Sequence, residues 1–187
     1  MAVTTTTQGS AEVESVARSA LVGALFDAWD GLDLVLDGVT PAEMTEPWGG
    51  GSAFAWTYGH VANSIDAWLN ARFQGRTPHP VIGARDLRFG GSGRATDWPT
   101  IRRGVAEVRA TARDYLHRLA DADLDLVIPY DGSIVALRAP GLSLRHAVTV
   151  NLVHHHYHLG EIATKRAQLG HAVPHLPGPR QRLYDAV

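Results

Sequence analysis

Histidines at one particular spacing are the clearest chemical signal in this chain. The stretch 151–162 reads Asn-Leu-Val-His-His-His-Tyr-His-Leu-Gly-Glu-Ile and holds four histidines in five consecutive positions. On a helix of about 3.6 residues per turn, His154 and His158 lie about 40° apart, so both imidazoles can reach one metal ion. His155 and His156 lie roughly 100° and 200° from His154, so at most one of them shares that face. A catalytic zinc usually takes three protein ligands and leaves a position open, so a third ligand must come from elsewhere.

His60 is the candidate for that third ligand. It lies in the middle of a stretch, 52–74, whose apolar and aromatic residues recur at helical intervals. A histidine among apolar neighbours is more often a core residue that is hydrogen-bonded to its surroundings. The pair at i, i+4 spacing favours the metal-ligand interpretation instead. The run 154–158 could also be a surface tract without a site, but it lies inside an apolar-periodic helix rather than at a terminus.

The composition limits what kind of site this can be. With 187 residues, 45% of them hydrophobic and 19% charged, the chain is long enough for a sizeable core and predicts one domain over 1–187. We expect its ordered core at about 11–170 and a loosely packed tail over 171–187. The absence of cysteine excludes disulfides, iron–sulfur clusters, zinc fingers and a cysteine nucleophile. Any metal must therefore be held by His, Asp or Glu.

Charge and hydropathy argue against nucleic acid and membrane as partners. The formal net charge is -2 and the arginines are scattered, so the sequence offers no basic surface for nucleic acid. The N-terminal segment lacks the features of a signal peptide, and no run of about 18 apolar residues is present. We therefore expect a cytoplasmic protein that acts on a small molecule.

Helical periodicity divides the chain into a few long elements. The predicted helices cover 11–36, 52–74, 97–121 and 143–168. Thr40 and Glu43 flank a proline and predict a capping box that begins a short turn. Ser52 can cap the second long helix and Ser143 the last one, which Gly170 ends.

The segments between these helices are of two kinds. The loop 75–97 lacks periodicity, and connections of that length are often functional, so it could lie over a pocket. The run 124–138 contains Asp131-Gly132 between two strand-like stretches, which predicts a hairpin with a type I′ turn. The arginines of the third helix are expected to face solvent; they are Arg102, Arg103, Arg109 and Arg113.

Together these elements predict an all-α fold, a four-helix bundle with a small β-hairpin inserted before the last helix. Bundles of this type build their sites from side chains that point inward from facing helices. His60 on the second helix can then meet His154 and His158 on the last helix, which completes a set of three histidine ligands.

The order of elements and the histidine motif resemble the DinB/YfiT-like metalloprotein superfamily. That family pairs a histidine near the middle of the second helix with His-x-x-x-His-x-Gly-Gln on the last helix. Here the matching segments are Gly-His60-Val-Ala-Asn and His154-His-His-Tyr-His158-Leu-Gly160-Glu161. The resemblance runs from the first helix to Gly170. It implies a divalent metal, zinc or nickel or another first-row ion, on His60, His154 and His158, with open coordination positions.

Glu161 departs from the family pattern, which usually has glutamine there. Its carboxylate could hydrogen-bond an imidazole, act as a base or face solvent. Members of the superfamily include thiol S-transferases that use bacillithiol or mycothiol, a mycothiol-dependent isomerase and enzymes of natural-product pathways. The Ala-, Gly- and Arg-rich composition with almost no lysine suits a GC-rich genome and hence mycothiol.

These observations leave several functions open. The first hypothesis is a metal-dependent thiol S-transferase with Trp56, Asn63 and Asn151 lining the substrate pocket. The second is a metal-dependent hydrolase in which Glu161 or His155 is the catalytic base. The third is a non-enzymatic metal-binding or stress protein that forms a homodimer. The fourth is a biosynthetic cyclase or isomerase that works without metal, because histidines alone can do acid–base chemistry near neutral pH.

Overall fold

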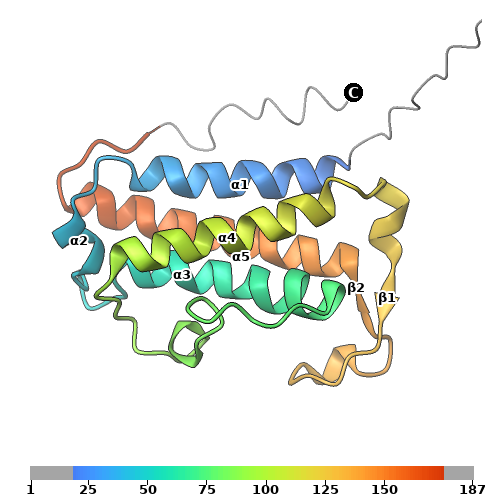
Figure 1. Cartoon of the computed structure of the whole chain (residues 1–187). Coiled ribbons are helices and arrows are strands. Elements are labelled where there is room, and N and C mark those ends of the chain that lie inside the picture. The colour runs from blue at the N-terminus through green and yellow to red at the C-terminus, as the bar shows by residue number, and fades with distance from the viewer. Residues whose placement is uncertain (1–18, 175–187) are drawn as a thin grey trace, which may run out of the picture.

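Four long helices form the body of the computed structural model, which describes residues 19–174 (Figure 1). They are α1 (Ala20–Leu36), α3 (Phe54–Ile65), α4 (Trp98–Leu116) and α5 (Leu144–Gln168). Helix α5 packs against α1 and α3, and α3 also packs against α4. The apolar stripes of these helices meet in one core, whose largest fully buried side chains include Trp29, Phe54, Leu69 and Ile162. The predicted all-α fold with a small antiparallel pair of strands before the last helix is confirmed.

Several helix ends follow the local signals. In the short helix α2 (Pro41–Thr45), Thr40 and Glu43 form the predicted capping box. The Ser143 side chain accepts the backbone N–H of His146 and caps α5, and Gly170 follows that helix with a φ of 84°. The expected cap of the second long helix is wrong, because α3 begins after Ala53, which has no side chain to accept a hydrogen bond. The expected start of the first helix at 11 lies outside the described residues.

The stretch expected as one α-helix over 52–74 changes its winding. After α3 the chain continues as a π-helix, η1 (Asp66–Arg72). The buried Asp66 carboxylate accepts the backbone N–H of His79, and the Asn70 amide donates to the Val108 carbonyl. These two hydrogen bonds connect the wider turns of the π-helix to the following loop and to α4. The periodicity of apolar residues does not reveal such polar contacts, so the sequence did not predict the π-helix.

The hairpin is present in a different register from the one expected. Strand β1 (Val127–Ile128) pairs antiparallel with β2 (Leu142–Ser143), and the second strand predicted over 133–138 is wrong. That part holds the 3-10 helix η4 (Val135–Leu137) instead. Asp131-Gly132 cannot form a type I′ turn, which needs two positive φ angles, because neither residue has one. Gly141, with a φ of 83°, turns the chain into β2.

The arginines on α4 do not all face solvent, which corrects the expectation for Arg109. Its guanidinium is buried and donates to the Asp33 carboxylate at 2.8 Å and to the Tyr58 hydroxyl at 3.2 Å. It also lies over the rings of Tyr58 and Trp29. Acidic and aromatic residues of α1 and α3 therefore stabilise the buried guanidinium. The cation–π contacts and the ion pair offset the cost of its burial.

Nothing in the described part of the chain is built to cross a bilayer: between residues 19 and 174, no helix is both long and apolar enough.

Candidate metal centre

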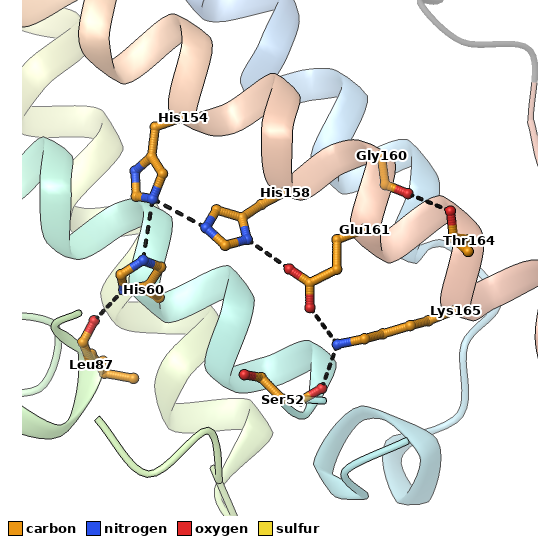
Figure 2. Close-up of polar contacts among 9 residues, drawn as sticks. All are labelled: Ser52, His60, Leu87, His154, His158, Gly160, Glu161, Thr164 and Lys165. Atoms are coloured by element: carbon orange, nitrogen blue, oxygen red, sulfur yellow. Dashed lines mark hydrogen bonds and ion pairs between the residues drawn. The ribbon is translucent and has the colours of Figure 1, made fainter. Parts of the chain in front are cut away.

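Three imidazoles converge between α3 and α5 (Figure 2). His60 comes from the middle of α3, and His154 and His158 come from successive turns of α5. The Nε2 atom of His154 lies 3.2 Å from Nε2 of His60 and 3.1 Å from Nε2 of His158. The ligand atoms of all three residues lie within 4.8 Å of one another. The structure thus brings together the three histidines that the sequence singled out.

Neighbouring acceptors determine which ring nitrogen carries the proton in two of these histidines. His60 Nδ1 lies 2.7 Å from the Leu87 carbonyl, and His158 Nδ1 lies 2.8 Å from a Glu161 carboxylate oxygen. Because both partners only accept, Nδ1 must be the donor in each ring. In the neutral rings the Nε2 lone pairs of His60 and His158 therefore point toward the centre, the usual arrangement when histidine binds a metal.

The donor set fits a divalent first-row metal. His154 Nε2 contacts two lone pairs and carries at most one proton, so at least one of the two short N···N contacts lacks a hydrogen. A cation at the centre would remove that repulsion. Metal–nitrogen bonds of about 2.0–2.1 Å place neighbouring ligand nitrogens about 2.9 Å apart in octahedral geometry and about 3.4 Å apart in tetrahedral geometry. The two observed separations lie between these values.

Burial favours the uncharged, metal-binding form of two of the three histidines. Burial, followed by the nearby His158 and His60, lowers the pKa of His154 to about 4. Burial also lowers the pKa of His60, although its hydrogen bond to the Leu87 carbonyl opposes the shift. Neutral imidazole is the ligand form, so protons compete weakly with a metal here.

Glu161 contacts the centre through His158. Of the roles open to its carboxylate, the structure shows the hydrogen bond to an imidazole. This bond, and then the ion pair with Lys165, lower the pKa of Glu161 to about 2. One carboxylate oxygen accepts from His158 and the other from Lys165. Sequence reasoning missed Lys165, although its position four residues after Glu161 on the same helix was a usable signal.

Comparison with known proteins shows the family of this chain. The family model of the DinB superfamily matches residues 24–162, which is well over half of the chain. The chain belongs to the DinB superfamily. The resemblance inferred from the histidine motif is confirmed.

One solved structure similar to this DinB-superfamily chain is a DinB-like protein from Bacillus cereus ATCC 10987. The two share 15% sequence identity with a TM-score of 0.54, and the match covers 84% of this chain and 95% of that one. At this identity the likeness shows a common fold. Comparison with curated proteins gave no match.

In this DinB fold, the loop 75–97 supports the centre with its second half. The 3-10 helix η2 (Arg85–Leu87) presents its carbonyls to α3. Leu87 accepts from His60, and Asp86 accepts from the Trp56 indole at 2.8 Å. The Trp56 ring stacks on His60 with centroids 4.8 Å apart. The first half of the loop lines a separate cleft of about 330 Å³ next to η1 and α4.

The other residues expected at the site have different surroundings. Asn63 donates to the Ile82 carbonyl at 2.6 Å. Asn151 is fully buried and donates to the Ala147 carbonyl one turn back. His155 is also fully buried, with Nδ1 2.6 Å from the Asn151 carbonyl and its ring beside Trp29. Burial lowers the pKa of His155 well below the usual value, so it is neutral. Trp56 is thus the expected pocket residue that contacts a triad histidine.

The three histidines differ in burial. His60 is 9% exposed, whereas His154 and His158 are both half-buried. Tyr157 is 73% exposed, and its ring packs at nearly a right angle to the His158 ring. A set of three protein ligands is typical of catalytic metal sites, whereas structural sites usually have four.

Gly91 offers a test of how the loop supports the centre. A Cβ there would lie 1.7 Å from the Asp86 carbonyl oxygen, so alanine must open the turn that carries Asp86 and Leu87. We expect Gly91→Ala to weaken metal affinity about tenfold, as changes in residues that orient ligands do. Gly160→Ala on α5 is the control, because nothing lies within 4 Å of its added Cβ. Metal titration of both variants checks this, and equal affinities would show that the loop does not position His60.

Proposed function

We propose that this protein is a divalent-metal-dependent transferase that moves a low-molecular-weight thiol of the mycothiol kind onto a small electrophile. The observation that carries the proposal is the partly exposed triad of histidines, whose neighbouring carboxylate is already occupied by two partners. Zinc and nickel are among the metals that imidazole ligands suit.

The chain's own residues would hold the metal through three ligands and leave further coordination positions free. The Nε2 atoms of His60, His154 and His158 are the ligands, and Leu87 and Glu161 orient the first and last of these rings. A metal at this position supplies a Lewis acid that lowers the pKa of a thiol beside it. The thiol proton passes to solvent, and the sulfur forms a bond to the electrophilic carbon as the leaving group departs with the electron pair.

The surroundings of the two candidate bases argue against base-assisted attack by water. Glu161 has both oxygens engaged, and His155 is fully buried against Trp29. A metal held by three histidines can lower the pKa of bound water from about 15.7 to about 7, so hydrolysis is the alternative that turnover without thiol would reveal. A thiol has a pKa of about 8.5, so the metal alone can make it a thiolate at neutral pH.

The test is turnover by metal-loaded protein without a histidine tag, using a thiol such as mycothiol or cysteine and chlorodinitrobenzene as the electrophile. We expect product only when both thiol and metal are present, and none with His158→Ala. Turnover of ester substrates without thiol would identify a hydrolase. Activity that survives complete chelation would indicate a metal-independent reaction. Metal binding without any turnover would identify a metal-binding protein.

A further inference from the structure

Lys165 is the only lysine of this chain, in which all other basic residues among the 17 are arginines. It lies on α5 and is 8% exposed. A buried ammonium is costly unless it is paired and hydrogen-bonded. The contacts of Lys165 must therefore account for its place in the interior.

Those contacts connect the two helices that carry the candidate metal ligands (Figure 2). Lys165 Nζ donates to one carboxylate oxygen of Glu161, whose other oxygen accepts from His158. The same ammonium donates to the Ser52 carbonyl at 2.8 Å. Ser52 lies just before α3, the helix that bears His60. One ammonium thus holds both the partner of His158 and the beginning of the helix that carries His60.

The space around the ammonium accounts for lysine at this position. A Cβ added to Gly51 would lie 3.0 Å from Nζ and 3.1 Å from Cε of Lys165, so the backbone packs closely against the side-chain end. A compact ammonium fits this space, whereas the planar guanidinium of arginine is larger and directs its hydrogen bonds in a fixed fork.

We propose that Lys165 is a positioning residue of the metal centre, which fixes Glu161 so that Glu161 can orient His158. The proposal rests on the proposed metal site. Without the ammonium, the Glu161 side chain, which is 30% exposed, is free to turn toward water. The His158 ring then loses the partner that directs its Nε2 to the centre.

A positioning role for Lys165 and a simple effect of its charge predict opposite changes in metal affinity when the ammonium is removed. A positive charge near a divalent cation opposes binding, so if charge alone mattered, removing the ammonium would tighten metal affinity. Loss of a residue that orients a metal ligand typically weakens affinity about 10–100-fold. The direction of the change therefore distinguishes the two effects.

The experiment compares Lys165→Met with Arg103→Met, which removes the same charge from an exposed position on α4. Zinc affinity is measured by competition titration, and the ligand field by the absorption spectrum of the cobalt-loaded protein. We expect Lys165→Met to bind zinc about tenfold more weakly with an altered cobalt spectrum, and Arg103→Met to match the wild type. Zinc binding by Lys165→Met as tight as in the wild type, or tighter, would overturn the proposal.

A double variant separates positioning from mere structural support. In Glu161→Gln the amide N–H₂ must face either His158 or Lys165, both of which donate, so metal affinity falls. In Glu161→Gln/Lys165→Met the amide oxygen can face His158 without that conflict. We expect the double variant to bind zinc no more weakly than either single variant. Losses that multiply would mean that Lys165 acts independently of Glu161.

These measurements also separate this inference from the proposed function. A wild-type chain that binds no metal overturns both, whereas a wild type that binds and a Lys165→Met variant that binds equally overturns this inference alone. If Lys165→Met does not fold, lysine-selective ¹⁵N labelling of the wild type gives one side-chain signal. We expect a slowly exchanging ammonium whose signal shifts in Glu161→Gln, and a freely solvated ammonium would contradict the proposal.

Discussion

Replacing His154 by alanine should abolish metal binding and leave the fold of the metal-free protein nearly unchanged. Both short Nε2 contacts of the cluster run through His154, so its loss leaves two histidines where a catalytic site needs three. The side chain is half-buried, and its burial already costs enough to lower its pKa to about 4. We therefore expect a loss of affinity beyond the roughly 100-fold that a change in an orienting residue produces.

The measurement is elemental analysis of protein purified without a histidine tag, together with thermal unfolding. At a thousandfold excess over its Kd, a metal that binds the folded state adds about 4 kcal/mol of stability. In a chain of this size that raises the Tm by roughly 8–16 °C. The wild type should show this rise and lose it with chelator, whereas His154→Ala should not show it.

His156→Ala is the matched control, because it removes one imidazole from the same run. His156 is exposed, and its Nδ1 lies 3.0 Å from the Leu152 carbonyl of its own helix. It should bind as much metal as the wild type. Equal metal loss in the two variants would mean that the histidine run binds ions as a surface tract and that no defined centre exists.

The features that the sequence predicted correctly are those set by neighbours along the chain. The capping box of Thr40 and Glu43 and the Ser143 cap are contacts between residues three apart. The pairing of His154 and His158 follows from the helical repeat alone. His60 is 94 residues from His154 along the chain, and it could be joined to the pair only because the bundle topology was predicted as well.

The features that the sequence did not show depend on contacts with backbone atoms far along the chain. The Ser52 carbonyl accepts a hydrogen bond from Lys165, the Asp86 carbonyl from Trp56, and the Leu87 carbonyl from the His60 ring. A backbone carbonyl has no residue-specific signature in the sequence. Every residue has one, so a pattern of side chains cannot reveal which will be used. The strand register was mispredicted for a similar reason. The local turn preference of Asp131-Gly132 suggested a hairpin there, but the chain turns at Gly141 and β1 pairs with Leu142–Ser143.

His155 shows how much one position along a helix can change a role. It was a candidate base by its place in the histidine run, yet its ring turns into the core beside Trp29 while the neighbouring His154 faces the centre. His155→Ala should therefore keep full metal stoichiometry and lose stability. Removing a fully buried ring leaves a cavity, although the buried Nε2, which has no partner among the described residues, makes the ring less favourable there than an apolar one.

We expect His155→Ala to lower the free energy of unfolding of the metal-free protein by about 2 kcal/mol. Urea unfolding of wild type, His154→Ala and His155→Ala, each stripped of metal, gives the comparison, and metal content is measured on the loaded proteins. The two adjacent alanine variants should behave in opposite ways, because one side chain contributes a ligand and the other fills the core. Metal loss with unchanged stability in His155→Ala would place this histidine at the centre and restore it as a candidate base. Lost stability with metal retained would confirm that this side chain fills the core and is not a metal ligand.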